Sequence, residues 1–306
     1  MNAPGDQVAT IDVGTNALLL LVARRERNGR LLTLIDRATV TGLGRGVGRS
    51  GALAPDKVEA TLRVFHDYVE QARAAGVTVV RAVGTSALRE ASNANDFLGP
   101  AAQLLGTPVE VITGRREAEL TFRGSIEGLD LDPGEVTVLD IGGGSTEIVR
   151  GEPGRLRQAA SLDLGSVRLY ERHVDTDPPA PQQVAALRED IREALAHSPV
   201  QPTERLVGIA GNVTTVAALI HAIDPYDPDR VHGQRVSGDE IAALAERLSG
   251  MTMAERKKLP GIEPGRADVI VAGTLLLLGI VEHAGAGEVI VSNGGVRVGL
   301  ALELTD

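Results

Sequence analysis

Apolar residues along the chain follow two spacings, one typical of strands and one typical of helices. Short aliphatic runs at residues 8–13 and 18–24 predict two strands, and the polar segment 14–16 between them predicts the turn that pairs them. Residues 55–75 carry apolar side chains three and four positions apart, which predicts an amphipathic helix that ends at Gly76. Strand and helix patterns alternate in this way along the whole chain, and this alternation is typical of an α/β fold.

The remaining elements follow from the same two spacings. Strands are predicted at 77–83, 109–112, 136–140, 146–150, 206–210 and 289–291, and helices near Gly114, after Gly165, after Pro181, at 238–249, at 266–283 and at the end of the chain. The most apolar stretch, 269–281, is too short to span a bilayer. It predicts a buried helix.

One arrangement occurs twice: an apolar strand, an aspartate, a glycine turn and then polar side chains. Residues 12–16 read Asp-Val-Gly-Thr-Asn, and residues 140–147 read Asp-Ile-Gly-Gly-Gly-Ser-Thr-Glu. Consecutive backbone N–H groups at such turns bind anions, and carboxylates beside a bound phosphate need a hard cation between them. The repeat therefore predicts two α/β halves and a magnesium-phosphate site.

Composition narrows the range of functions. The 306 residues include three Phe, three Tyr and no Trp, and the net charge is -10. This excludes the aromatic platforms of single-stranded nucleic-acid binders and argues against a general nucleic-acid surface. With no cysteine, disulfides, thiolate catalysis and cysteine-ligated metals are excluded. No export signal is recognisable at the start of the sequence, so we expect a cytoplasmic protein that does not bind membranes.

Six segments, in this order, resemble those of the exopolyphosphatase and guanosine pentaphosphate phosphohydrolase family. They are residues 12–16, 84–93, 113–118, 140–147, 261–268 and 292–295. The family belongs to the actin-like, sugar-kinase-like superfamily. The resemblance implies an α/β protein of two ribonuclease-H-like (actin-like ATPase) domains with an interdomain cleft. It places the N-terminal domain at 1–124 and the C-terminal domain at 125–306, and allows the helix at about 296–306 to pack back on the first domain.

The resemblance also implies site residues. Glu117 corresponds to the family's catalytic carboxylate, which orients and deprotonates the attacking water. Asp140, Glu147 and Asp12 are the metal candidates, with Mg²⁺ as the expected ion and Mn²⁺ as the alternative. The phosphate-binding candidates are Gly14, Thr15, Asn16, Arg89, Asn93, Gly143, Gly144, Ser145 and Arg266.

At two positions the chain departs from the family pattern. Arg116 stands where the family often has an acidic residue, and a cation there is expected to lower the pKa of Glu117 unless Arg116 points at substrate. Ala17 stands where the family usually has serine. One hydroxyl is therefore missing, and a neutral hydrogen bond contributes roughly 1 kcal/mol.

The function that the resemblance implies is exopolyphosphatase activity, the metal-dependent release of terminal orthophosphate from inorganic polyphosphate. Three alternatives stay open: the same hydrolysis of guanosine pentaphosphate, a sensor of polyphosphate or alarmone with little turnover, and an ATP-dependent kinase. The expected partners are inorganic polyphosphate, guanosine penta- or tetraphosphate and a second copy of the chain in a homodimer.

Overall fold

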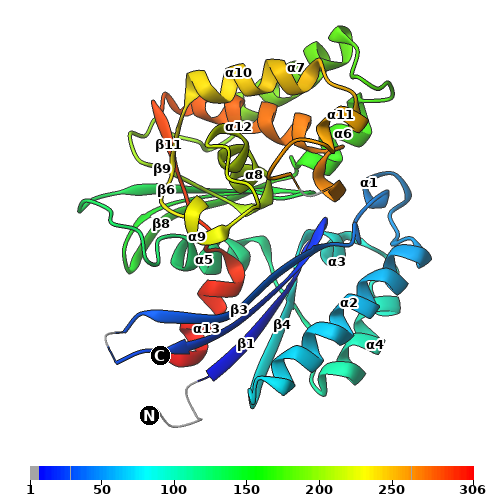
Figure 1. Cartoon of the computed structure of the whole chain (residues 1–306), viewed down its shortest axis with the longest axis vertical. Coiled ribbons are helices and arrows are strands. Elements are labelled where there is room, and N and C mark those ends of the chain that lie inside the picture. The colour runs from blue at the N-terminus through cyan, green and yellow to red at the C-terminus, as the bar shows by residue number, and fades with distance from the viewer. Residues whose placement is uncertain (1–6, 28, 263) are drawn as a thin grey trace. The chain divides into compact units, whose positions relative to one another are not determined.

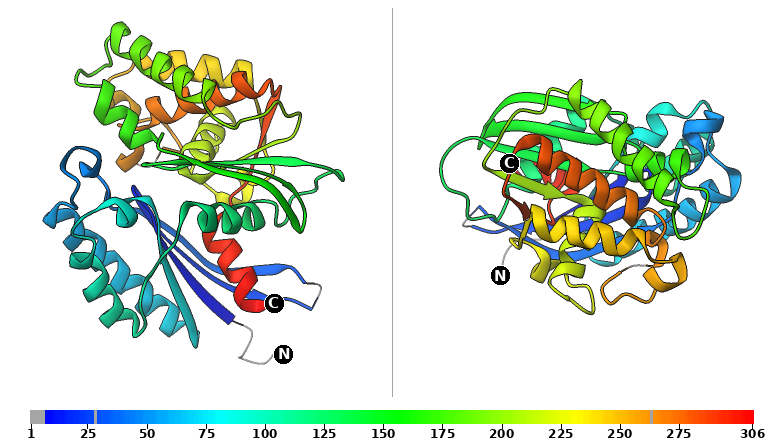
Figure 2. Two further views of the ribbon diagram at one scale, coloured as in Figure 1. Left: turned by 180° about the vertical axis from the view of Figure 1, so that it is seen from behind. Right: turned by 90° about the horizontal axis from the view of Figure 1, so that it is seen from above.

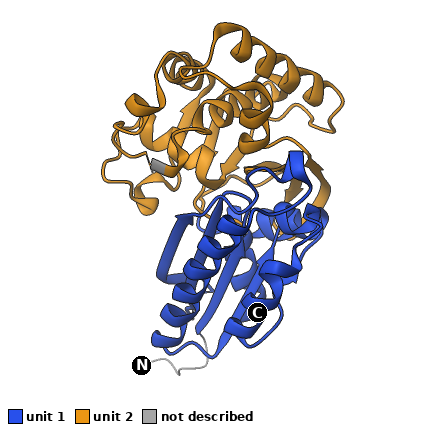
Figure 3. Ribbon diagram, turned by 90° about the vertical axis from the view of Figure 1, so that its right-hand side faces the viewer, with its two compact units in different colours: residues 1–128, 296–306 blue, residues 129–295 orange. Residues whose placement is uncertain are grey.

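The computed structural model describes residues 7–27, 29–262 and 264–306. Residues 1–6, in which no export signal was recognised, and Glu263, within the 261–268 motif, lie outside them. The chain forms two compact units (Figure 3). Unit 1 combines Met1–Gly128 with Val296–Asp306, and unit 2 is Leu129–Gly295. The sequence places the boundary after residue 124; in the structure it follows Gly128, and the last helix belongs to unit 1.

Unit 1 contains a five-stranded sheet in the order β3-β2-β1-β4-β5 (Figure 1). Its strands are β1 (Gln7–Val13), β2 (Ala17–Arg25), β3 (Leu31–Val40), β4 (Val79–Gly84) and β5 (Glu110–Val111). β1, β2 and β3 are antiparallel, whereas β4 runs parallel to β1 and β5 parallel to β4. Its helices are α1 (Val47–Ser50), α2 (Pro55–Ala74), α3 (Ser86–Glu90), α4 (Asn95–Leu105), α5 (Gly114–Ser125) and α13 (Val296–Thr305).

Alternation along β1 gives the sheet of unit 1 two different faces. Ala9, Ile11 and Val13 pack in the core that α2 and α4 cover. Val8, two positions before Thr10, packs instead in a cluster with residues of α13. Helices α5 and α13 lie together on this second face (Figure 2). Asp12 is four positions after Val8 on β1, so its side chain lies on the same face of the sheet as Val8. This is the face that carries α5 and α13.

Unit 2 repeats the arrangement with one additional strand. Its sheet has the order β10-β11-β9-β6-β7-β8. The strands are β6 (Val136–Ile141), β7 (Thr146–Glu152), β8 (Arg155–Leu162), β9 (Leu206–Ile209), β10 (Arg235–Ser237) and β11 (Glu288–Val291). The helices are α6 (Ser166–His173), α7 (Pro181–Ala196), α8 (Ala210–Ile220), α9 (Pro228–Val231), α10 (Gly238–Ser249), α11 (Met253–Arg256) and α12 (Ile270–Ala284), with a short 3-10 helix at Pro264–Arg266.

In each sheet, three antiparallel strands lie next to one another, and two further strands run parallel to the third of them, which is β1 in unit 1 and β6 in unit 2. In unit 1 these are β3-β2-β1-β4-β5, and in unit 2 they are β8-β7-β6-β9-β11, to which β10 adds an antiparallel edge. This order is that of a ribonuclease-H-like fold. The predicted fold class, two such α/β domains, is confirmed.

Helix α12 forms the centre of the unit 2 core. Nearly every residue from Ile270 to Val281 is buried, as predicted for the apolar stretch. Among the helices of the described residues, none is long and apolar enough to cross a membrane.

Two predicted boundaries in unit 2 are wrong. The strand predicted at 206–210 ends at Ile209, and Ala210 already belongs to helix α8. The helix predicted at 266–283 starts only at Ile270, after the short 3-10 helix. Buried contacts along α8 override the low helix propensity of its glycine, valine and threonine residues.

Candidate functional site

The first aspartate segment forms a two-residue hairpin turn between β1 and β2. The Gly14 N–H donates to the Ala17 carbonyl oxygen at 3.1 Å, with Thr15 and Asn16 at the tip. A Cβ on Gly14 would lie 2.8 Å from that oxygen, so glycine is required for the close approach.

Backbone N–H groups in the loop after β3 donate hydrogen bonds to the carbonyl groups of this turn. The Gly44 N–H donates to the Thr15 oxygen at 2.8 Å, and the N–H groups of Thr41 and Gly42 donate to the Asn16 oxygen at 3.0 and 2.9 Å. Within the described residues, no hydrogen bond is found from the N–H groups of Thr15 and Asn16. The buried Oδ1 atom of Asn16 also has no partner there. The turn therefore retains two donors suited to an anion.

The second aspartate segment has the same geometry. The Gly142 N–H donates to the Ser145 carbonyl oxygen at 3.0 Å, and Gly143 and Gly144 form the tip between β6 and β7. A Cβ on Gly142 would lie 3.0 Å from the Ser145 oxygen. The sequence repeat thus corresponds to a structural repeat, one hairpin in each unit.

Here helix α6 binds the turn carbonyls. The Ser166 N–H donates to the Gly142 oxygen at 3.0 Å, and the N–H groups of Val167 and Arg168 donate to the Gly143 oxygen at 2.9 and 3.2 Å. Arg168 Nε donates to the next carbonyl oxygen of the turn at 2.9 Å. The N–H groups of the two tip glycines make no hydrogen bond with any described residue. In both hairpins, then, the turn carbonyl groups accept hydrogen bonds from the same unit, while the tip amide groups make none with a described residue and stay available for an anion.

Two metal candidates lie side by side in unit 2. Asp140 on β6 is directly opposite Glu147 on β7, which is directly opposite Ser161 on β8. Glu147 is 1% exposed, and Ser161 Oγ donates to its Oε1 at 2.7 Å. Paired carboxylates at such positions repel each other unless a cation or proton compensates them. Ser161, which the sequence analysis did not identify, completes this row of oxygen atoms.

This pair fits Mg²⁺, which is commonly held by one or two carboxylates and retains several waters. The third metal candidate, Asp12, lies in unit 1. No group of three or more His, Cys, Asp or Glu side chains suited to a metal is found among the described residues. These residues therefore do not indicate a metal site whose ligands all come from protein side chains.

Glu117 lies in the first turn of α5. Thr113 caps this helix by accepting the Arg116 N–H at 3.2 Å. Glu117 is 5% exposed, and its Oε2 accepts a hydrogen bond from Arg89 Nη1 at 2.7 Å. Arg89 Nη1 also donates to the Ile112 oxygen at 3.0 Å. Burial raises the pKa of Glu117, while the hydrogen bond and the charge of Arg89 lower it. Arg89 thus holds the candidate base in place.

Asp12 is a second buried carboxylate in unit 1. Burial, and then the negative charge of Glu117, raise the pKa of Asp12 to about 7, against the opposing effect of Arg297. Asp12 Oδ1 has no hydrogen-bond partner within the described part of the chain. The structure therefore brings Asp12, Glu117 and Arg89 into one electrostatic cluster, together with Arg297, which the sequence analysis missed.

The expectation for Arg116 needs correction. Arg116 Nη2 bonds to both carboxylate oxygens of Glu303 on α13, at 2.5 and 2.6 Å. The cation that lowers the pKa of Glu117 is Arg89, twenty-eight positions away in sequence. Arg116 stabilises the contact between α5 and α13 instead.

We expect Arg116→Ala to leave kcat and its pH profile unchanged within about twofold, because its partner is Glu303 and a half-exposed ion pair contributes only about 0.2–1 kcal/mol. Phosphate release measured across pH tests this, with Arg89→Ala as the variant that does shift the profile. If the acid limb of the pH profile moved in the Arg116→Ala variant, the charge of Arg116 would be shown to act on Glu117.

Asn93 has a structural role in unit 1. Its Oδ1 accepts the Leu53 N–H at 2.7 Å, and its Nδ2 donates to the Leu53 oxygen at 3.1 Å and to Asp96 Oδ2 at 2.9 Å. These bonds fasten the chain before α2 to the start of α4, and they engage both ends of the amide that was predicted to bind phosphate.

Arg266 lies against the start of α8. A Cβ on Gly211 would be 1.9 Å from Arg266 Nη1, so the guanidinium covers that glycine. The next residue, Asn212, donates to the Ile141 oxygen at 2.8 Å and to Ser166 Oγ at 3.0 Å. Arg266 is therefore connected, through α8, to the strand and helix that hold the unit 2 hairpin.

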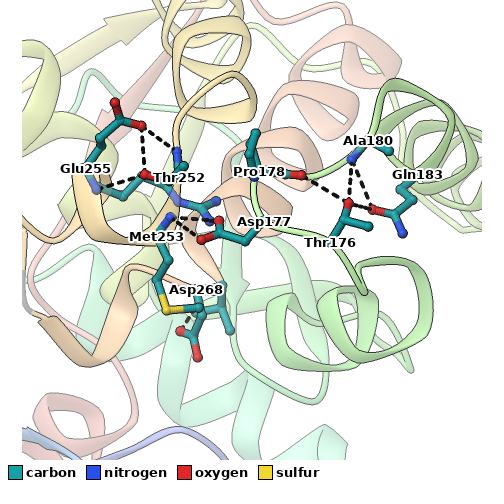
Figure 4. Close-up of polar contacts among 11 residues, drawn as sticks. Thr176, Asp177, Pro178, Ala180, Gln183, Thr252, Met253, Glu255 and Asp268 are labelled. Atoms are coloured by element: carbon teal, nitrogen blue, oxygen red, sulfur yellow. Dashed lines mark hydrogen bonds and ion pairs between the residues drawn. The ribbon is translucent and has the colours of Figure 1, made fainter.

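A polar network in unit 2 links the loop before α7 to the segment before α12 (Figure 4). Asp177 accepts the Met253 N–H at 2.7 and 3.0 Å and Arg256 Nη2 at 3.1 Å. Arg256 is 1% exposed. This network holds α11 in place, and α11 shortly precedes the segment that carries Arg266.

Comparison with known proteins agrees with this architecture. The Ppx/GppA phosphatase family matches residues 21–306. Exopolyphosphatase 2 of Mycobacterium tuberculosis is 37% identical, over 97% of this chain and 98% of the relative. A solved structure of a Ppx/GppA family member from Aquifex aeolicus is 34% identical, with a TM-score of 0.83 over 98% of this chain and 97% of that chain. An exopolyphosphatase structure from Cytophaga hutchinsonii is 26% identical, with a TM-score of 0.88 over 98% of both chains. The repeated fold, the paired hairpins and these matches show that the chain belongs to the Ppx/GppA phosphatase family.

Proposed function

We propose that this protein is an exopolyphosphatase, which hydrolyses the terminal phosphoanhydride bond of inorganic polyphosphate and releases orthophosphate. The observation that carries the proposal is the buried Glu117, bonded to Arg89 at 2.7 Å. The 37% identity to an exopolyphosphatase over nearly the whole chain supports the choice of substrate.

In the proposed reaction, Glu117 is the general base. It accepts a proton from a water whose oxygen forms a bond to the terminal phosphorus. The bond from that phosphorus to the bridging oxygen breaks, and its electron pair stays with the shortened polyphosphate. Such phosphoryl transfer depends on positioning and charge stabilisation more than on covalent catalysis. Burial suits Glu117 to this role, because a raised pKa makes the carboxylate a stronger base.

The hairpin turns are the proposed phosphate-binding groups. The N–H groups of Thr15 and Asn16 in unit 1, and of Gly143 and Gly144 in unit 2, would donate to phosphate oxygens. Arg89 is proposed to bind phosphate in addition to holding Glu117. A guanidinium offers five donors, and in the described part of the chain Glu117 and Ile112 occupy only its Nη1 group.

Asp140 and Glu147 are the proposed ligands of Mg²⁺, with Mn²⁺ as the alternative. When bound there, the ion would neutralise charge on the phosphate oxygens. Ser161 would orient Glu147 through its hydrogen bond.

The experiment compares phosphate release from polyphosphates of several lengths with release from guanosine pentaphosphate, at equal concentrations of chain ends and with Mg²⁺, Mn²⁺ or EDTA. We expect kcat/KM for polyphosphate to be higher by about tenfold or more, because the chain has few aromatic residues to stack on guanine. Faster release from guanosine pentaphosphate would reassign the substrate. Tight polyphosphate binding without release under either metal would identify a sensor.

A further inference from the structure

Asn212, in the first turn of α8, makes two hydrogen bonds inside unit 2. Its Nδ2 atom donates to the Ile141 carbonyl oxygen at 2.8 Å and to Ser166 Oγ at 3.0 Å. A carbonyl oxygen can only accept, so the bond to Ile141 fixes which end of the amide faces β6. Asn212 is 7% exposed. From this buried position it ties the end of β6 to the start of α6.

Ser166 extends this link to the hairpin turn of unit 2. Its Oγ atom donates to the Gly142 carbonyl oxygen at 3.2 Å, and its backbone N–H donates to the same oxygen at 3.0 Å. Gly142 immediately precedes the tip glycines, Gly143 and Gly144. Asn212 therefore bonds directly to the residue before the turn and, through Ser166, to the first residue of the turn.

Close packing holds the Asn212 amide in this position. A Cβ on Gly273 of α12 would lie 2.2 Å from Asn212 Oδ1 and 2.6 Å from its Cγ, so glycine is required there if the amide is to keep its place. Helix α6 approaches the hairpin just as closely, because a Cβ on Gly165 would lie 2.4 Å from the Gly143 carbonyl oxygen. With so little free space, a displaced amide also displaces the groups to which it is bonded.

The backbone that presents Asn212 is strained. Ala210, the first residue of α8, has φ 68°, a left-handed conformation that residues other than glycine seldom adopt. Ile209, at the end of β9, is paired with Asp140 of β6, so this strained turn starts α8 beside the end of β6. Strain of this kind persists where the surrounding structure imposes it, and it is concentrated at functional sites.

We propose that Asn212 is a positioning residue for phosphate binding in unit 2. Its two hydrogen bonds hold the hairpin against α6, so that the N–H groups of Gly143 and Gly144 keep the direction in which they donate to phosphate oxygens. Asn212 acts through Ile141 and Ser166 and does not itself contact phosphate. This inference rests on the proposed function, in which the hairpin binds phosphate.

The test measures kcat and KM for polyphosphate with Mg²⁺ in the full chain. It also measures the Kd for tripolyphosphate by calorimetry in the Glu117→Gln background, where turnover does not interfere. We expect Asn212→Ala to raise KM and Kd by about fivefold or more, with kcat within about threefold, because the tip amides lose their alignment while the proposed base is unchanged. A purely structural defect reduces the amount of active protein, which lowers kcat and leaves KM and Kd as they are.

Gly273→Ala acts on the same amide without removing it. Its Cβ displaces the Asn212 side chain, so KM and Kd should rise as in Asn212→Ala. Combined with Asn212→Ala, it should raise them by less than about twofold further, because the group that it displaces is already absent.

Thr274→Ala is the matched control. Thr274 is the next residue of α12, is fully buried, and donates to the Ile270 carbonyl oxygen at 2.7 Å within its own helix. Its replacement should lower the midpoint of urea unfolding, because a buried hydrogen bond is lost. KM and Kd should stay within about twofold of their values without the substitution.

Unchanged KM and Kd in a folded Asn212→Ala protein, a loss confined to kcat, or full additivity of the Asn212 and Gly273 variants would each overturn the inference. If Asn212→Ala does not fold, Ser166→Ala decides by the same criteria, because it removes the link to Gly142. Absence of phosphate release from the wild-type protein would count against the proposed function, and the Kd values would then decide this inference alone. A Glu117→Gln protein that binds no tripolyphosphate would overturn it as well.

Discussion

Replacing Glu117 by glutamine is expected to lower kcat for polyphosphate by about 10²–10⁴-fold, the usual contribution of a general base. Glutamine has nearly the same shape, and its amide oxygen can still accept the hydrogen bond that Arg89 donates to Glu117. The amide cannot accept a proton from water at neutral pH. The loss should therefore appear in kcat, with the fold and substrate binding retained, as measured by phosphate release and circular dichroism.

Glu119→Gln is the matched control. Glu119 lies on the same helix, is partly exposed and pairs with Arg115 at 3.1 Å. It should keep nearly full activity. A folded Glu117→Gln protein that releases phosphate at the wild-type rate would exclude Glu117 as the base.

The pH profile tests the same assignment. Burial raises the pKa of Glu117 above its ordinary value of 4.5, so kcat should fall as the pH is lowered through this raised pKa, because protonated Glu117 accepts no proton. Arg89 lowers the pKa, so its removal should shift the acid limb to higher pH. The Glu117→Gln variant should lack this limb.

Sequence patterns predicted elements well where one face is buried. The helix predicted at 55–75 is α2 (Pro55–Ala74). The helix predicted at 238–249 is α10, which has the predicted bounds. Strands β3 and β8 were missed. β3 is exposed along much of its length, and β8 alternates between exposed and half-buried positions. Without a buried face, neither strand gives a strong periodic signal.

The candidate site was predictable as far as local motifs describe it. The two hairpins are encoded within a few residues each, and the opposition of Asp140 and Glu147 follows from a two-residue turn. Contacts between distant segments were not predictable. Arg297 bonds to a residue 287 positions away, and Glu303 to one 187 positions away. No periodicity in a single sequence specifies which helix covers which face of a sheet.

The largest stability effect is expected at Gly299, where α13 crosses α5. A Cβ at this position would lie 2.0 Å from the Leu120 carbonyl oxygen and 2.9 Å from the Leu120 Cα. These are backbone atoms within a helix, so they cannot rotate away, and the two helices would have to separate. We expect Gly299→Ala to lower the free energy of unfolding by about 3 kcal/mol, the upper end for overpacking, although alanine favours a helix by about 1 kcal/mol.

Gly99, inside α4 of the same unit, is the matched control. Outside its own helical turn, no atom of the described residues lies within 4 Å of a Cβ placed there, but Pro100 follows it and disfavours the helical conformation of a preceding residue that carries a Cβ. Gly99→Ala should therefore change the free energy of unfolding by less than about 1 kcal/mol, because this effect opposes the gain in helix propensity. Urea unfolding followed by circular dichroism measures both variants, and equal midpoints would refute the close crossing of α13 and α5. Since α5 carries Glu117, Gly299→Ala should also reduce kcat in the protein that remains folded, whereas Gly99→Ala should not. The close crossing would then serve two purposes: it completes the core of unit 1, and it holds the helix that carries the proposed base in place against α13.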